Sequence, residues 1–192
     1  MDVTRFGLLM LLDTPICDFG WRATDFSLKN PDGVCFTMSD QLADKALLIM
    51  FISNHCPYVI AVAERLASDM KELQSHGVNV MAVMSNDYRD YELDSPPNMK
   101  QFAEQYGFTF PYLVDESQSV ATAYGAVCTP DFFGFNQRGE LQYRGRLDSA
   151  AMGDASNRER ELVNAMLQIV KTGKGPEQQT PSMGCSIKWR RQ

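Results

Sequence analysis

The sequence predicts one α/β domain with a central mixed sheet flanked by helices. Three observations lead to this fold class. A continuous apolar run over 46–52, ALLIMFI, has the length and composition of a strand that is buried on both faces. A segment with apolar residues at helical spacing connects it to a second run of this kind, Val78–Met84, as in a β-α-β unit. No internal repeat or linker divides the 192 residues.

The composition indicates an ordered domain and excludes one class of partner. The chain is 44% hydrophobic and 22% charged, which is typical of a globular protein with a proper core. Its formal net charge of −6 gives no basic face for nucleic acid, and the terminal cluster KWRRQ is too short to change this. We therefore expect no nucleic-acid partner.

The chain ends are expected to lie outside the domain. Residues 1–24 would form an N-terminal lead, 25–175 the domain, and 176–192 an irregular tail without periodicity. The apolar run Leu8–Leu12 is too short for a secretory signal and is closed at once by Asp13. No segment approaches the ~18–20 apolar residues that span a bilayer. We therefore expect a cytoplasmic protein with no membrane contact.

The first elements are expected to be a hairpin and a crossover. Alternating apolar and polar residues on both sides of NPDG predict an N-terminal β-hairpin extension, with strands over Phe26–Leu28 and Val34–Phe36. The apolar spacing from Pro57 to Gln74 then predicts one helix, and Gly77 suits its end.

Turn residues and periodicity set the order of the later elements. A polar loop over 85–97, SNDYRDYELDSPP, is most simply a solvated connection, and its length also suits a lid or a partner surface. Ser117 suits the N-cap of a short helix. The predicted elements are a helix over 98–107, a strand over 110–115, a helix over 117–126, strands over 131–136 and 141–147 joined by QRGE, and a helix over 157–174.

The cysteines give no sign of a metal site. The chain has five cysteines, at positions 17, 35, 56, 128 and 185, which is an odd number with wide spacing. No C-x-x-C pair suggests a zinc knuckle, and we expect neither a metal nor a cofactor. In a reducing compartment each is by default a free thiol, often a buried apolar one. We interpret Cys17 and Cys35 as structural, with Cys35 on a strand face of the hairpin.

Cys56 lies in SNHCPYV, directly after the first buried strand and at the first turn of the predicted helix. Functional sites of open α/β sheets commonly lie beyond the carboxyl ends of strands. Pro57 suits the first helical position, and the free N–H groups of a helix start stabilise a thiolate. A buried packing cysteine is the alternative, but the polar residues just before Cys56 fit it poorly. The position therefore favours a reactive nucleophile.

A second feature is GAVCTPDFFGFN, in which Pro130 immediately precedes a predicted strand. Proline cannot donate a hydrogen bond to a strand ladder, so this placement is unusual. Thr129-Pro130 is therefore a candidate cis peptide bond, although only ~5–6% of X–Pro bonds in folded proteins are cis.

Together these features resemble the thioredoxin fold. DFSLKNPDG, NHCPYV, GAVCTPDFF and a C-terminal GCSIKW further resemble the redoxin branch of that superfamily, the alkyl hydroperoxide reductase and thiol-specific antioxidant family, over about Asp25 to Trp189. The resemblance implies a thioredoxin-like fold with Cys56 as the redox-active nucleophile. It also implies a cis-proline loop at Thr129-Pro130 that flanks this nucleophile.

The chain departs from the pattern of these proteins at several positions. Thioredoxins carry a resolving cysteine three residues after the nucleophile, where this chain has Val59. They also bury an acid six residues before it, where this chain has Met50. Of the peroxiredoxin proline and threonine that precede the nucleophile, only a hydroxyl is retained, at Ser53. The peroxiredoxin arginine that helps to hold the peroxide has no clear counterpart.

A resolving cysteine must therefore come from elsewhere in the chain. Cys128 lies beside the TP loop and should be near the nucleophile in this fold. Cys185 lies in the tail, which could bring its thiol to Cys56 of the same chain or of a partner in a homodimer. Either could instead be a packing cysteine, Cys185 under a tail docked through Ile187 and Trp189. Both alternatives stay open for both residues.

Residues around the nucleophile are candidates for tuning it. His55, if protonated, would favour the thiolate, and a solvated loop residue is the alternative. Ser53 or Asn54 is a candidate helix cap, and Tyr58 could shape a substrate face. Asp131 is a candidate proton relay, although a charge that ends a strand is the commoner case. The predicted active-site shell comprises Ser53, His55, Pro57, Thr129, Pro130 and Asp131.

The leading hypothesis is a thiol-dependent oxidoreductase with an antioxidant role. The Cys56 thiolate would attack a peroxide, or a protein or low-molecular-weight disulfide, and Cys128 or Cys185 would resolve the product. A thioredoxin-like reductant would restore the thiols. The alternative is a copper(I) chaperone or an interaction module on the same fold. A copper(I) site of this kind needs two close cysteines and a histidine. His76 lies at the far end of the predicted helix, away from Cys56.

Overall fold

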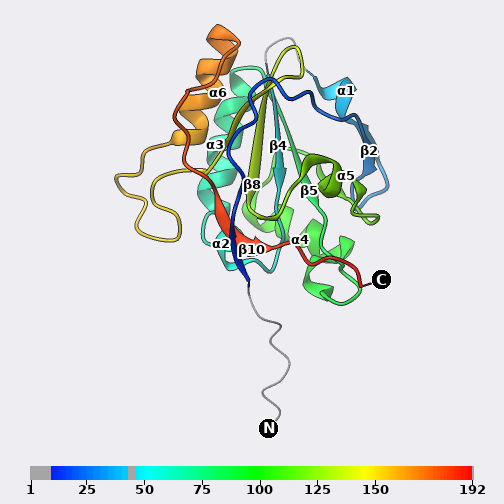
Figure 1. The fold of residues 1–192 in the computed structure, drawn as a ribbon. Coiled ribbons are helices and arrows are strands. Elements are labelled where there is room, and N and C mark those ends of the chain that lie inside the picture. Colours follow the sequence, from blue (N-terminus) through cyan, green and yellow to red (C-terminus); the bar gives the residue numbers. More distant parts are fainter. Residues whose placement is uncertain (1–9, 43–45, 192) are drawn as a thin grey trace.

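A seven-stranded mixed sheet forms the centre of the protein (Figure 1). The computed structural model describes residues 10–42 and 46–191. The strands of this sheet are β2 (Ser27–Lys29), β3 (Cys35–Thr37), β4 (Ala46–Phe51), β5 (Val78–Met84), β6 (Tyr112–Val114), β8 (Asp131–Asn136) and β9 (Leu141–Gly145). In the order β3-β2-β6-β5-β4-β8-β9, β4 is parallel to β5 and antiparallel to β8, which confirms the predicted mixed α/β fold.

Helices cover both faces of this sheet. They are α1 (Met38–Gln41), α2 (Pro57–Ile60), α3 (Ala63–Ser75), the 3-10 helix η1 (Glu92–Asp94), α4 (Pro96–Tyr106), α5 (Ser119–Tyr124) and α6 (Glu161–Thr172). Apolar residues of α3, α4 and α6 share one core with the sheet, and those of α1 and α5 share the other (Figure 1). No helix in the described parts of the chain is both long and apolar enough to cross a membrane.

β4 is central because it has a strand on each side and a core on each face. All six of its residues are buried. Successive side chains of a strand point to opposite faces. Leu48 and Met50 therefore join the core beneath α3, α4 and α6, while Leu47 and Ile49 join the core beneath α5. This two-sided burial explains why the sequence shows a continuous apolar run here instead of an alternating one.

The prediction of one continuous helix from Pro57 to Gln74 is wrong, because two helices form this segment. The chain forms α2, turns at Ala61 and Val62, and continues as α3. The Val62 carbonyl still accepts a hydrogen bond from the Leu66 N–H at 2.8 Å. Val59 before the turn and Leu66 after it lie in the same core. Apolar periodicity is therefore preserved across the turn and does not reveal it.

Two helix starts also differ from the prediction. Gln118, with φ of 62°, is the residue that precedes α5, so Ser117 is not its N-cap. α6 begins later than predicted, and Arg158 and Arg160 just before it bind Asp69 of α3, at N–O distances of 2.7 and 2.8 Å. The hairpin strands β2 and β3 each lie one residue later than predicted.

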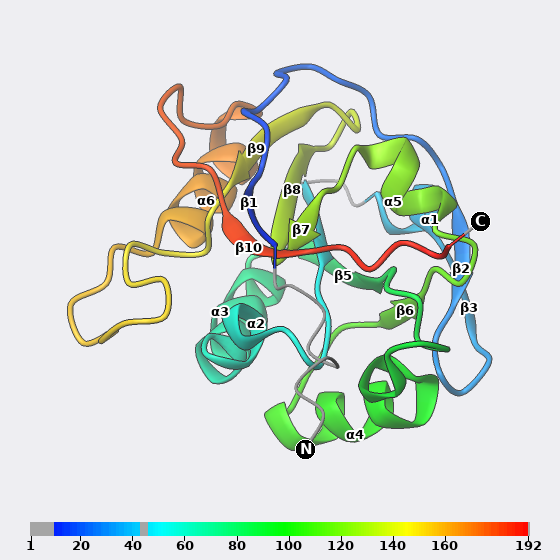
Figure 2. The same cartoon turned by 60° about the horizontal axis from the view of Figure 1, so that its bottom comes forward.

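A second, three-stranded sheet joins the two ends of the described chain (Figure 2). It consists of β1 (Leu11–Asp13), β10 (Met183–Ser186) and β7 (Cys128–Thr129), with β10 in the middle and antiparallel to both neighbours. The expectation of an irregular tail over 176–192 is therefore wrong for β10. Its four residues are too few for a readable alternation. The division of the chain at 24 and 175 stays a prediction, and the lead before Met10 lies outside the described residues.

Hydrogen bonds and one glycine hold the tail against β7. Ser182 Oγ donates a hydrogen bond to the Pro130 carbonyl at 2.7 Å. The Ile187 N–H donates to a carbonyl just before β7 at 3.0 Å. A Cβ atom on Gly184 would lie 2.0 Å from the Thr129 carbonyl oxygen. A residue without a Cβ atom is therefore needed for β10 to lie this close to β7.

We expect Gly184→Ala to lower the free energy of unfolding by about 1–3 kcal/mol, the usual range for overpacking a tight contact. β10 must move away from β7 to admit the methyl group. Chemical denaturation measures the loss. Gly153→Ala is the matched control, because its Cβ would meet only the Ala150 carbonyl oxygen, at 3.2 Å. Equal losses in the two variants would contradict the importance of this contact.

Candidate active site

Cys56 lies where the sequence places it, between the end of β4 and the start of α2. It is the N-cap residue, Pro57 takes the first helical position, and the Val59 N–H donates to the Cys56 carbonyl at 3.0 Å. No side chain caps this helix, so the expectation that Ser53 or Asn54 does so is wrong. Because α2 has only four residues, its dipole contributes little to the site.

The Cys56 thiol is fully buried and faces the proline loop. In its protonated form, its Sγ donates a hydrogen bond to the Thr129 carbonyl at 3.0 Å. The Thr129-Pro130 peptide bond is cis, which confirms the expectation from the sequence. Ser53 Oγ lies 3.4 Å from Thr129 Oγ1, so this hydroxyl reaches the same loop. The strand-to-helix turn and the proline loop therefore meet at Cys56.

Cys185 on β10 reaches the same sulfur. It lies opposite Thr129 of β7, and directly opposed residues of antiparallel strands point to the same face. The Cys185 thiol hydrogen-bonds the Cys56 sulfur, which is the main reason why the pKa of Cys56 is lowered to about 6. Burial opposes this effect, and the Thr129 hydroxyl and the Val59 N–H reinforce it. At neutral pH Cys56 is therefore mainly a thiolate.

The same contact has the opposite effect on Cys185. The hydrogen bond to the Cys56 sulfur raises the pKa of Cys185 well above its ordinary value. Burial and the negative charge on Cys56 raise it further, while Lys188 opposes them. The pair is thus asymmetric, with a thiolate at Cys56 and a thiol at Cys185. Thiol–disulfide exchange depends on a thiolate of this kind as the attacking group.

Cys128 is close to the site in sequence but lies on the other face of the small sheet. It precedes Thr129 on β7, so its side chain points away from the face that carries Cys185. Burial raises the pKa of Cys128 above the ordinary range, and Asp131 raises it further. Of the two candidate resolving cysteines, the structure brings Cys185, and not Cys128, to Cys56.

Asp131, the candidate proton relay, takes part in a buried ion pair. Its Oδ2 accepts a hydrogen bond from the Arg144 guanidinium at 2.8 Å. Burial raises the pKa of Asp131 to about 6, and Arg144 opposes this rise. The next residue, Phe132, shares a core with Cys56, so Asp131 points to the other face of the sheet. The structure therefore does not bring Asp131 to the thiol pair.

A buried acid that no sequence pattern singles out holds the loop before the nucleophile. Asp94 of η1 is fully buried. Its carboxylate accepts hydrogen bonds from the Asn54 N–H at 2.7 Å, from His55 Nδ1 at 2.6 Å and from the Asn86 amide at 2.8 Å. The His55 ring also stacks on Tyr91, with ring centroids 5.3 Å apart. This one carboxylate thus ties together the loops that follow β4 and β5.

The loop over 85–97 is therefore more than the solvated connection that we expected. Asp94 of η1 points inward and contacts His55, the residue that precedes Cys56. The side chain of His55 is only 17% exposed, so the solvated alternative for this histidine is wrong. In the sequence Asp94 is one acid among several in a polar stretch. Nothing local distinguishes a buried carboxylate from its solvated neighbours.

A small cavity reaches the thiol pair from outside. Its volume is about 230 Å³. Its lining residues are Met10, Leu11, Pro57, Tyr58 and Cys185. Cys56 itself is 0% exposed. Cys185, the cysteine with the raised pKa, thus lines the cavity, and Cys56 does not.

The remaining cysteines lie away from this pair. Cys17 is half-buried, and burial is the main cause that raises its pKa to about 11. Cys35 is exposed on β3, on a strand of the hairpin as expected. Among the residues that the structure describes, no group of three or more His, Cys, Asp and Glu side chains could hold a metal ion.

Comparisons with known proteins agree with this fold. Residues 19–144 match the AhpC/TSA family. A thiol-disulfide oxidoreductase, ResA, of Halalkalibacterium halodurans is 26% identical over 129 residues, which cover 67% of this chain and 69% of that protein. The crystal structure of an uncharacterized conserved protein from Geobacillus kaustophilus is 40% identical, with a TM-score of 0.90 over 97% of this chain and 100% of that one. A hypothetical protein from Sinorhizobium meliloti 1021 is 38% identical, with a TM-score of 0.86 over 93% and 97% of the two chains.

These matches cover the segments that build the site. The family match runs from before β2 into β9 and includes both Cys56 and the TP loop. The similarity to the Geobacillus kaustophilus structure extends over 97% of this chain. Because the family match extends over more than half of the 192 residues, the chain belongs to the AhpC/TSA family.

Proposed function

We propose that the protein is a thiol-dependent oxidoreductase in which Cys56 is the nucleophile and Cys185 the resolving cysteine. One observation carries this proposal. The Cys185 thiol hydrogen-bonds a Cys56 sulfur whose pKa is lowered to about 6. A thiolate with a second thiol beside it provides the two parts of a redox cycle. The name of the Halalkalibacterium halodurans relative, a thiol-disulfide oxidoreductase, supports the same chemistry.

With a peroxide as the oxidant, the cycle has two steps. The Cys56 thiolate attacks one peroxide oxygen and the O–O bond breaks. Cys56 becomes a sulfenic acid, and the leaving oxygen takes up a proton from water. The Cys185 sulfur then attacks the Cys56 sulfur, a disulfide forms, and water leaves. An external dithiol of the thioredoxin kind returns two electrons and restores both thiols, which gives the protein an antioxidant role in a reducing compartment such as the cytoplasm.

A disulfide is the second candidate substrate, and the name of the relative favours it. Cys56 would attack one sulfur to give a mixed disulfide, and Cys185 would then release the substrate thiol. The end product is the same Cys56–Cys185 disulfide. The full burial of Cys56 and the 230 Å³ cavity favour a small oxidant over a polypeptide.

A copper(I) chaperone has less support from this site. Cys56 and Cys185 do provide two close sulfur ligands, which copper(I) prefers. Metal binding needs deprotonated cysteines, however, and the pKa of Cys185 is raised. Within residues 10–42 and 46–191, no third His, Cys, Asp or Glu side chain completes a metal group.

Limiting hydrogen peroxide followed by peptide mass spectrometry tests the assignment of the two cysteines. We expect a Cys56–Cys185 disulfide in the wild type and in the matched control Cys128→Ser. Cys56→Ser should form no disulfide with Cys185, and Cys185→Ser should accumulate the sulfenic acid on Cys56. A Cys56–Cys128 disulfide, or a Cys56 that stays unmodified, would contradict the proposal.

The rate at which Cys56 is oxidised should rise with pH through a midpoint near 6, because only the thiolate attacks and the pKa of Cys56 is about 6. Cys185→Ala removes the main hydrogen bond that lowers this pKa. The midpoint should then move up, toward the ~8.5 of a free cysteine. Rapid-mixing measurement of sulfenic acid formation gives the profile, and Cys128→Ala should leave the midpoint in place. An unchanged midpoint in Cys185→Ala would contradict the proposal that Cys185 lowers the pKa of Cys56.

Asp94→Asn keeps the size of the buried side chain but removes the charge that faces His55. We expect a loss of about 1–3 kcal/mol in the free energy of unfolding, the range for leaving buried hydrogen-bonding groups poorly paired. Chemical denaturation measures it. Asp32→Asn is the matched control, because Asp32 pairs with Lys100 at the surface, where such pairs contribute little. A loss in the control as large as in Asp94→Asn would show that the buried carboxylate has no special part.

A further inference from the structure

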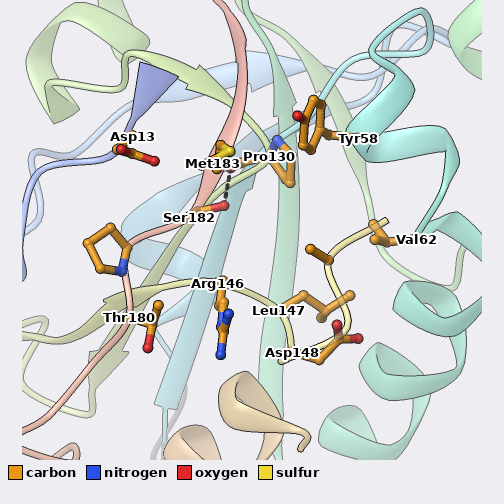
Figure 3. A pocket seen from close by; sticks show the side chains of 12 residues that line it. Asp13, Tyr58, Val62, Pro130, Arg146, Leu147, Asp148, Thr180, Ser182 and Met183 are labelled. Atoms are coloured by element: carbon orange, nitrogen blue, oxygen red, sulfur yellow. Dashed lines mark hydrogen bonds between the residues drawn. The ribbon is translucent and has the colours of Figure 1, made fainter. Parts of the chain in front are cut away.

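The tail is held on both sides of Cys185. Before this residue, Ser182 Oγ donates a hydrogen bond to the Pro130 carbonyl at 2.7 Å, at the wall of a cavity of about 300 Å³ (Figure 3). After it, the chain leaves β10 and runs across the loops that follow β5 and β6 (Figure 2). Between these two points β10 pairs with β7 through Cys128 and Thr129. The place of Cys185 therefore depends on where the tail is fixed after it, as well as before it.

Two buried side chains bind the backbone of Lys188, three residues after Cys185. Asn86 Oδ1 accepts a hydrogen bond from the Lys188 N–H at 2.8 Å, and Gln118 Nε2 donates one to the Lys188 carbonyl at 2.9 Å. The Asp87 N–H donates to the same carbonyl at 2.8 Å. Asn86 and Gln118 are 4% and 7% exposed, so a broken bond would leave buried polar groups unpaired. We call these two residues the Lys188 clamp.

Gln118 contributes to the clamp with its whole side-chain amide. Besides its bond to the tail carbonyl, Nε2 donates to the Ser85 carbonyl at 2.7 Å. Its Oε1 accepts a hydrogen bond from the Arg190 N–H at 2.8 Å. The φ of Gln118 is 62°, in the left-handed region that favours glycine. Glycine would suit this backbone better, but it could not join the tail to the loop after β5.

Asn86 connects the clamp to the loop before the nucleophile. Its Nδ2 donates a hydrogen bond to Asp94 Oδ2 at 2.8 Å. The same carboxylate accepts hydrogen bonds from the Asn54 N–H at 2.7 Å and from His55 Nδ1 at 2.6 Å. One buried amide thus holds the tail through its oxygen and, through Asp94, the segment that leads into Cys56. The clamp therefore fixes the tail relative to the nucleophile.

We propose that Asn86 and Gln118 are positioning residues, which hold the tail so that the Cys185 thiol stays against the Cys56 sulfur. This deepens the proposed function, on which it rests, because it assigns residues that act on the two thiols through the backbone of Lys188. When the tail is released at Lys188, Cys185 is held less closely. Cys56 then loses part of the hydrogen bond that lowers its pKa, and its sulfenic acid meets the second thiol more slowly.

Two variants open the clamp in independent ways. Asn86→Ala removes both the acceptor of the Lys188 N–H and the donor to Asp94. Gln118→Gly removes the donor to the Lys188 carbonyl without touching Asp94. Because glycine suits the left-handed backbone at this position, Gln118→Gly remains usable if Asn86→Ala does not fold.

The rate of Cys56 oxidation by hydrogen peroxide is measured against pH, together with the rate at which the disulfide with Cys185 then closes. In Asn86→Ala the pH midpoint should rise by about one unit, which means about tenfold less thiolate below the midpoint. The disulfide should close about tenfold more slowly. Gln118→Gly should change both quantities in the same direction but less, because the tail carbonyl keeps its bond to a backbone N–H.

Asn136→Ala is the matched control. Asn136 is 1% exposed, its Nδ2 donates to the Gly173 carbonyl at 3.1 Å, and its Oδ1 accepts from the Arg138 N–H at 2.9 Å. It lies opposite Ala46, at the other end of β4 from Cys56. This variant should also lower the free energy of unfolding, but it should keep the wild-type midpoint and closure rate.

A double variant separates positioning from the charges near the thiols. Lys188 carries a charge that acts on Cys185, and Asp94 and His55 adjoin the nucleophile. When Cys185→Ala is already present, adding Asn86→Ala should move the midpoint no further, because the thiol that the clamp positions is absent. An additional shift as large as that of Asn86→Ala alone would refute the positioning role.

Two further results would overturn the inference, and a third would remove its basis. Wild-type midpoints and closure rates in both clamp variants would refute the positioning role, although Cys56 and Cys185 would keep their proposed parts. A shift in Asn136→Ala as large as in Asn86→Ala would refute it too, because the loss of any buried amide would then have the same effect. If hydrogen peroxide leaves Cys56 of the wild type unmodified in mass spectra, the proposed function fails together with the inference.

Discussion

The hydrogen bond between Cys185 and Cys56 is the interaction on which the rest of the site depends. It lowers the pKa of one sulfur and raises that of the other, so that a single contact favours a thiolate at Cys56 and a protonated thiol at Cys185. The contact exists because β10 lies against β7, with Cys185 opposite Thr129. Gly184 permits this approach. A cysteine at a strand-to-helix turn thus owes its main activation to the other end of the chain.

The two sheets make different contributions to this arrangement. The large sheet fixes the place of Cys56, because β4 is buried on both faces and ends one short loop before it. Asp94 then fixes that loop from the neighbouring connection after β5. The small sheet supplies the second thiol, on Cys185 of β10. The core therefore positions Cys56, whereas β10 of the small sheet provides the thiol that lowers its pKa.

The parts of the fold that could be read from the sequence have local signals. The runs that became β4 and β5 have the length of buried strands, and the turn residues mark the hairpin and the proline loop. Cys56 is a candidate nucleophile for the same reason, from its place between a strand and a proline. The choice between Cys128 and Cys185 could not be made in this way. It depends on which face of β7 each side chain occupies, and this follows from the register of strands that are distant in sequence. The inward turn of Asp94 is likewise a property of tertiary packing.

The late position of β10 in the chain has a consequence for biosynthesis. Cys56 is made 129 positions before Cys185. Until the ribosome has released β10 and it has paired with β7, Cys56 lacks the main group that lowers its pKa. A nascent chain therefore carries a Cys56 whose pKa Cys185 does not yet lower. A product truncated before Cys185 lacks this cause of the lowered pKa altogether.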